Sequence, residues 1–157
     1  MKISGKFHVQ HIRNGEIIAE FDIPNGATLV GKNLLLNNGF RAGTGPSWYI
    51  GLINGTSATL AEADTMASHA GWTENTSYDE SARQTWSPDE ATNKILTNST
   101  PAVFTMSATG NVYGLFVTTN STKGGTTGTL WATAAFASPR AVADNDVLNV
   151  TYSTFLD

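Results

Sequence analysis

Short strand-like runs, repeated along the chain, constrain its fold more than any other sequence feature. Four of these runs occupy residues 102–108, 112–118, 129–136 and 147–155. The residues between them are turn formers, namely Gly110-Asn111, Lys123-Gly124-Gly125 and Asp144-Asn145-Asp146. Strands at this spacing with turn residues between them are typical of antiparallel sandwiches and barrels. The sequence therefore predicts a mainly β fold, either an antiparallel β-sandwich or a jelly-roll-like barrel.

The first 25 residues are predicted to form an N-terminal hairpin or arm. Residues 3–12 alternate apolar and polar side chains, and a second β-like run spans residues 16–23. Asn14-Gly15 lies between them and favours a type I′ turn, which needs a positive φ at both central residues. Phe7 and Val9 fall on the apolar face of the first strand.

One short helix is expected after the hairpin. Thr28 is a suitable N-cap, and Leu29, Val30, Leu34 and Leu35 follow near helical spacing. Asn38-Gly39 provides a stop signal. Because so short a helix is marginal in water, we expect its apolar face to pack on the sheet. Residues 48–53 are apolar throughout, as in a strand that is covered on both faces.

The segment 54–93 is long, polar and irregular, and it is the strongest candidate for a contact loop. A structureless loop of this length inside a domain is unusual unless it is functional or docks elsewhere. Aromatic and arginine side chains are enriched at protein interfaces. The predicted interface residues are Trp72, Tyr78, Arg83 and Trp86 from this loop, and Phe7 and Val9 from the hairpin.

Composition narrows the class of protein. A chain of 157 residues fits one β domain spanning 1–157, and only 14% of it is charged, against about 25% in typical domains. The net charge is −4 with no cluster of Lys or Arg, so nucleic-acid binding is not expected. The absence of cysteine excludes disulfides and is compatible with synthesis in a reducing cytosol. No signal-peptide-like start and no apolar stretch of about 20 residues is present, so no membrane association is expected.

A catalytic role would have to come from the middle of the chain. An acid/base pair would join His69 to Asp64 or Glu74, and a triad would add a serine such as Ser68. No strand–turn–helix nucleophile elbow supports either arrangement. The simpler interpretation is that these polar groups cap turns, so the chain is not expected to be an enzyme.

No metal or cofactor site is expected either. His8 and His11 are three positions apart on a strand, so they point to opposite faces and cannot share an ion. Asp144-Asn145-Asp146 resembles part of a calcium loop but lacks the bidentate Glu downstream, and it is predicted to form a turn. Most of the Trp, Phe and Tyr residues are assigned to the core, although two or three rings exposed on one face would make a carbohydrate platform.

Several motifs together resemble a family of small virion-associated structural proteins of tailed phages and prophages. The matching segments are the opening hairpin, residues 30–34, 48–53, 63–74 with Tyr78 and Arg83, 121–130 and 146–152. They span nearly the whole chain, and residues 63–74 form the most specific motif. Asn145 departs from the family pattern, which tends to have Gly there, and this affects only the turn.

The resemblance implies a component of the phage particle. Its implied role is that of a capsid decoration or cement protein, which binds the major capsid protein on the capsid surface and stabilises the shell. A homo-oligomer is expected because symmetric assemblies tend to use symmetric parts. The hairpin would add to the edge of a neighbour's sheet, and the 54–93 loop would order on docking. The alternative is a tail or baseplate module that binds a host-surface glycan.

Overall fold

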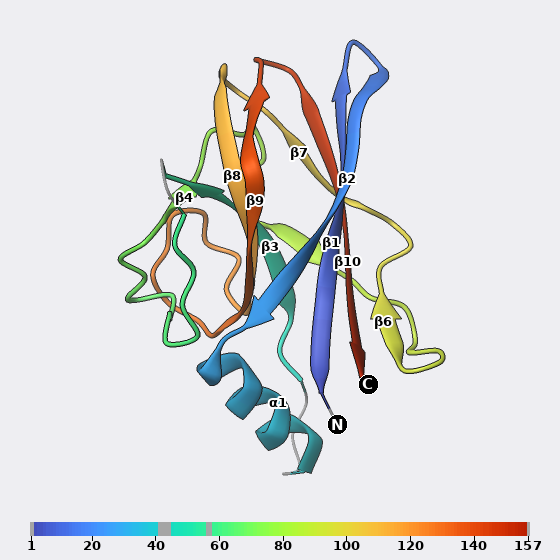
Figure 1. The fold of residues 1–157 in the computed structure, drawn as a ribbon, viewed down its shortest axis with the longest axis vertical. Helices are drawn as coiled ribbons and strands as arrows, with labels where there is room; N and C mark the ends of the chain where they lie inside the picture. The colour runs from blue at the N-terminus through green and yellow to red at the C-terminus, as the bar shows by residue number, and fades with distance from the viewer. Residues whose placement is uncertain (1, 41–44, 56–57, 157) are drawn as a thin grey trace.

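The computed structural model describes residues 2–40, 45–55 and 58–156. The fold is a mainly β, antiparallel sandwich with one short helix, as the sequence predicts (Figure 1). In chain order the elements are β1 (Ile3–Arg13), β2 (Glu16–Ala27), α1 (Leu29–Phe40), β3 (Trp48–Asn54), β4 (Thr73–Asn75), β5 (Gln84–Trp86), β6 (Ile95–Thr97), β7 (Ala102–Thr105), β8 (Gly110–Thr118), β9 (Leu130–Val142) and β10 (Val147–Leu156).

The strands form two sheets that meet at one corner. In the first sheet β1 lies between β2 and β10, and β6 and β7 pair with different stretches of β10. In the second, β8 lies between β9 and β3, and β4 and β5 pair with different stretches of β3. The last two residues of β2 pair with β9 and join the sheets. This order confirms the sandwich, whereas the jelly-roll alternative is not confirmed.

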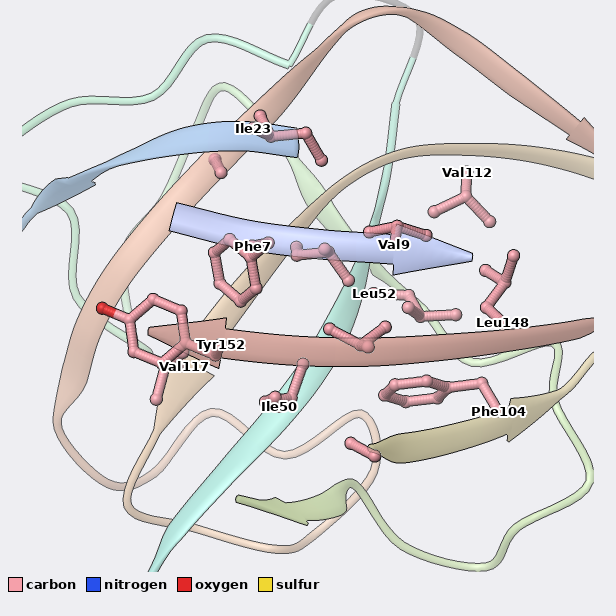
Figure 2. Close-up of a cluster of buried hydrophobic side chains, with 14 of the residues drawn as sticks. Phe7, Val9, Ile23, Ile50, Leu52, Phe104, Val112, Val117, Leu148 and Tyr152 are labelled. Carbon is pink, nitrogen blue, oxygen red and sulfur yellow. The ribbon is translucent and has the colours of Figure 1, made fainter. Parts of the chain in front are cut away.

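The main core lies between the two sheets. Phe7 and Val9 of β1 are fully buried, and they share one cluster with Ile50 and Leu52 of β3. Figure 2 shows these side chains gathered with residues of β7, β8 and β10 in the same space. The apolar alternation of the first strand therefore reflects burial inside the chain, and β3 is covered on both faces as predicted.

The N-terminal hairpin is confirmed and has one irregularity. Asn14 and Gly15 have φ values of 52° and 80°, which are the positive values that a type I′ turn requires. Register then shifts between His11 and Ile12, because His11 pairs with Ala19 whereas Ile12 pairs with Ile17. Ile18 is the extra residue of this β-bulge.

The helix is confirmed and it packs on β9 through Gly31, but two of the leucines expected on its apolar face do not take part. Thr28 caps it by accepting a hydrogen bond from the Gly31 amide at 3.1 Å, and it continues past the predicted stop to Phe40. Leu29 and Leu35 were expected to pack on the sheet, yet both are exposed, as is Leu36. The physical reason is that leucines at positions 29, 34, 35 and 36 are spread around a helix rather than gathered in one stripe.

Candidate functional site

All six residues predicted to form an interface are buried inside the chain itself. Their exposed fractions range from 0% to 5% for Phe7, Val9, Trp72, Tyr78, Arg83 and Trp86. A side chain this deeply buried cannot contact a neighbouring subunit without unfolding its surroundings. The predicted contact surface is therefore wrong for this structure, and these residues belong to the core.

Residues 58–93 of the predicted contact loop fold against their own domain, which corrects the expectation that the loop orders on docking. Arg83 explains much of this order. Its Nε and Nη2 atoms donate to the two carboxylate oxygens of Glu74 at 2.9 and 2.7 Å. It also donates to the carbonyl oxygens of Asn120 and Gly125 at 2.9 and 2.6 Å. A buried guanidinium is costly unless its donors are paired. The two bonds to Glu74 pair Arg83 within the segment, and the two bonds to Asn120 and Gly125 fix the segment to the β8–β9 loop.

The β8–β9 loop returns contacts to the same segment. The Lys123 ammonium donates to the carbonyl oxygens of Tyr78 and Glu80 at 2.7 and 2.8 Å and lies 4.2 Å from the centroid of the Tyr78 ring. The Gly124 amide donates to Glu74 at 2.8 Å. The partner that holds the 54–93 segment is thus a loop of the same chain, some 40 residues further along the sequence.

The residues considered for catalysis, Asp64, His69 and Glu74, each interact with another group and not with one another. Asp64 accepts hydrogen bonds from Trp72 Nε1 and the Ala61 amide, both at 3.0 Å. His69 stacks on the Trp72 ring and its Nδ1 lies 2.9 Å from the Trp72 carbonyl oxygen. Glu74 is committed to Arg83. The pairings of His69 with Asp64 or Glu74 that an acid/base mechanism would need are therefore not formed.

A second buried polar cluster lies where β1 meets the turn before β10. Nε2 of His11 is 2.5 Å from Asp146, whose carboxylate also accepts hydrogen bonds from Nε and Nη2 of Arg13 at 2.8 and 2.7 Å. Arg140 Nε donates to Nδ1 of His11 at 2.7 Å. Since Nδ1 accepts this bond, the His11 proton lies on Nε2 and the ring is neutral. The arrangement joins three segments, namely β1, β9 and the turn before β10.

The surroundings of this cluster shift both pKa values downwards. Burial lowers the pKa of His11, because the charged ring is disfavoured inside the protein. The hydrogen bonds from Arg13 hold the pKa of the Asp146 carboxyl well below its usual range. His8 lies on the solvent-facing side of the same strand, so the two histidines point to opposite faces as predicted.

The Asp144-Asn145-Asp146 stretch forms the predicted turn. Asn145 has a φ of 66°, and the Asp146 carboxylate accepts a hydrogen bond from the Ala143 amide at 2.8 Å. Among the residues that the structure describes, no group of three or more His, Asp or Glu side chains is placed to hold a metal ion. Within the same residues no helix has the length and apolar character needed to cross a membrane.

The aromatic side chains do not form a surface platform. Trp72, Trp86 and Trp131 are buried, and Trp48 packs against Trp131 with ring centroids 6.2 Å apart. Over the described parts of the chain every aromatic residue with an assigned burial is at least partly buried. The glycan-binding alternative depends on exposed rings that these residues do not provide.

The structure instead leaves one long strand edge unpaired. β2 pairs with β1 along one side, but on its other side it meets β9 only at Gly26 and Ala27. From Glu16 to Asn25 this outer edge has no strand partner among the described residues. Such an edge presents free backbone N–H and C=O groups, which are a template for pairing with another chain.

A bend in β9 opens the seam beside this edge. Ala135 pairs with Gly114 and Arg140 pairs with Val112, so residues 136–139 stand opposite Tyr113 alone. Pro139 in this stretch lacks a backbone N–H, which favours a break in pairing. The groove between the two strands has a volume of about 500 Å³ and is lined by residues 21–24 and 135–140. Phe21 and Phe136 meet edge to face across it, with centroids 5.2 Å apart.

The tip of the hairpin carries two exposed isoleucines that sequence reasoning missed. Ile17 is 53% exposed and Ile18 is 43% exposed. Both lie at the bulge, where the alternation of inward and outward side chains fails. The signal was present in the sequence, because two consecutive isoleucines interrupt a period of two. Figure 1 shows the hairpin extending away from the rest of the sandwich at this end.

The solvent-facing side of the hairpin is covered by paired charges. Lys6 and His8 lie 2.6 and 2.7 Å from Asp22, and His8 is also 2.9 Å from Glu20. These contacts fix the register of β1 and β2. The hairpin therefore offers a charged face, an apolar tip and an unpaired edge.

Comparisons with known proteins assign no family. No family model matches the chain, and no curated protein and no solved structure matches it. The hairpin is therefore identified as a candidate contact surface from its own geometry and not from a relative.

Proposed function

We propose that this chain is a virion structural protein that decorates the major capsid shell of a phage and stabilises it through the N-terminal hairpin. The observation that carries the proposal is the unpaired outer edge of β2 together with the exposed Ile17 and Ile18 at its tip. A rigid sandwich with a projecting strand edge is suited to adding a strand to a neighbour's sheet.

Contacts of this kind suit attachment to a shell that is built from many copies of one subunit. Strand addition supplies main-chain hydrogen bonds, and an apolar tip supplies buried area. Each contact is modest, but a decoration protein that bridges neighbouring subunits benefits from the high effective concentration of the second contact. The expected partner is the major capsid protein, the expected location is the outer surface of the capsid, and a homo-oligomer is part of the proposal.

Substitutions at the tip of the hairpin test the proposal through their effect on binding to phage heads. The double variant Ile17→Ser/Ile18→Ser changes side chains that the isolated domain leaves about half exposed, so its free energy of unfolding should stay within about 1 kcal/mol of the parent. Occupancy on heads that lack the protein should fall, with the half-saturating concentration rising about tenfold or more, since 1.4 kcal/mol of lost contact suffices for that factor.

A matched control is available on another strand. Ile95 is 45% exposed on β6, three strands away from β2 in the sheet. Ile95→Ser should bind heads like the parent. Equal occupancy of the double variant and the control would reject the hairpin as the attachment site, and no binding of the parent to the heads would reject the decoration role.

A further inference from the structure

One groove on the surface concentrates positive charge on an acidic protein. It has a volume of about 490 Å³ and lies between the start of β1, the end of β2 and α1. Lys2, Lys6 and Lys32 line it together with the carboxylate of Asp22, so the charged groups of the groove are mostly positive, whereas the chain has a net charge of −4. Such a local concentration of one sign attracts ligands of the opposite sign.

The groove is elongated. A second depression of about 310 Å³ shares Gly26, Ala27 and Lys32 with it and continues towards Leu60 and Glu62. Together the two depressions run across the end of β2. This shape fits an extended chain better than a compact ion.

The lysines are held loosely enough to change partners. Lys6 pairs with Asp22 and Lys32 pairs with Glu62, each at 2.6 Å, and all four side chains are at least 40% exposed. Exposed ion pairs of this kind contribute little to stability. Lys2 has no ion-pair partner among the described residues, so within that part of the chain one positive charge remains after Lys6 and Lys32 are matched.

The helix adds to the positive potential of the groove. Thr28, the N-cap of α1, lines the second depression, and the first turn of the helix contains no acidic residue. The positive end of the helix dipole is therefore not neutralised by its own side chains.

We infer that this groove binds an acidic, extended segment of another polypeptide. The carboxylates of that segment would pair with Lys2, Lys6 and Lys32, and its apolar side chains would cover Ile3 and Phe155, which also line the groove. The overall acidity of the chain disfavours a nucleic acid, which needs a wider basic surface. The inference does not rest on the hairpin as the site of capsid attachment.

Gly26 provides a direct test, because it lies in both depressions. A Cβ atom added at Gly26 meets no heavy atom within 4 Å, so a side chain there would occupy the open groove without displacing the fold. Gly26→Glu places a competing carboxylate in the groove. Gly110→Glu is the matched control, because Gly110 has the same free space and pairs with Val142 at the opposite end of β9 from the Gly26 partner Thr133.

The probe is a hexaglutamate peptide, titrated into the ¹⁵N-labelled full chain at low salt and followed by amide chemical shifts. The amides of residues 2–6, 26 and 32 should shift, and hexaglutamine should leave them unchanged. Gly26→Glu and the double variant Lys2→Gln/Lys32→Gln should each weaken binding about tenfold, and Gly110→Glu should not.

Three results would overturn the inference. The first is the absence of these shifts with hexaglutamate, and the second is equal affinity for the Gly26 and Gly110 variants. The third is binding of inorganic phosphate or a thymidine oligonucleotide at the same amides as tightly as the peptide, which would point to a general anion site or a nucleic-acid site instead.

Discussion

The guanidinium of Arg83 joins residues 74–83 to residues 120–125, two segments that the sequence keeps apart. Arg83 is only 2% exposed, and Glu74, which it pairs with, is itself largely buried. Removing one partner of such a pair leaves the other charge buried and unpaired. The residue therefore affects the stability of the domain rather than its attachment to a neighbour.

Arg83→Ala is expected to lower the free energy of unfolding by about 3–5 kcal/mol, as for other buried pairs that lose one partner. Lys32→Ala removes the exposed pair with Glu62 and should cost at most about 1 kcal/mol. Urea denaturation of both variants measures the difference. If Arg83→Ala were as mild as Lys32→Ala, the clamp between the two segments would not be a source of stability.

The pH dependence of stability should report on His11. Its pKa is lowered in the folded chain, whereas in the unfolded chain it returns to about 6.5. Below that value the unfolded state binds more protons, so the stability that neutral His11 confers is present above pH 6.5 and is lost as the pH falls through the folded pKa. Asp146 acts in the same direction at lower pH, because its pKa is also lowered.

Between pH 7.5 and 5.5 the free energy of unfolding should therefore decrease, with a contribution from His11 of up to about 1.4 kcal/mol per pH unit. His11→Gln should flatten the slope over this range, whatever its effect on the absolute stability. Denaturation curves at four or five pH values measure the slope, and an identical slope in the variant would show that His11 does not titrate differently in the folded state.

At the scale of single residues, the sequence pattern identifies Trp72 and Arg83 as contact residues but does not identify the groups that they contact. Trp72 and Arg83 were singled out because aromatic and arginine side chains in a polar segment favour contact with another surface. Both residues do make contacts, but with their own chain: Arg83 bonds to the β8–β9 loop, and Trp72 packs against Phe116 of β8. A pattern in one segment cannot tell whether the partner lies in another molecule or later in the sequence.

At the scale of elements, Gly31 determines how closely α1 packs against β9. A Cβ atom added to Gly31 would approach the Trp131 backbone oxygen and Cα atoms to 2.7 and 2.8 Å, so the helix crosses β9 at the closest distance that glycine permits. The exposed leucines contribute little to this packing. The start of the helix was predictable from Thr28, because capping is local, whereas its packing depends on β9, some 100 residues later.

Gly31→Ala is therefore expected to destabilise the domain by about 1–3 kcal/mol, the usual cost of overpacking, although alanine favours a helix. Asn33→Ala, at an exposed position of the same helix, should be neutral or stabilise it by about 0.5 kcal/mol. Thermal denaturation compares the two. A stabilising Gly31→Ala would mean that the helix does not press on Trp131.

The hairpin and the sandwich show which elements a sequence specifies. Asn14-Gly15 and the alternation on either side determine β1 and β2 locally, and the runs after residue 100 become β7 to β10. The bulge at Ile18 and the bend at residues 136–139 were not predicted. The bulge had a local signal, the two consecutive isoleucines that interrupt the alternation. The bend depends on how β9 pairs with β8 and with β2, which is a property of the assembled sheets.

At the scale of the whole molecule, the chain is a sandwich whose loops are tied inwards and whose hairpin edge is left unpaired. The 54–93 segment, expected to be the contact element, is held in place by Arg83 and Lys123. We therefore assign the proposed contact to the outer edge of β2 and the apolar tip of the hairpin, and not to the 54–93 segment. The Lys-lined groove at the other end of β2 would give the domain a second point of attachment.

The central claim is that the outer edge of β2 is occupied on an assembled particle. A cryo-electron microscopy reconstruction of phage heads prepared with the protein tests it most directly, because it gives both copy number and position. The account predicts many copies per shell, with residues 16–25 continuing a strand of an adjacent capsid subunit and with Ile17 and Ile18 covered. Copies whose hairpin stands free in solvent, or heads without the protein, would contradict it.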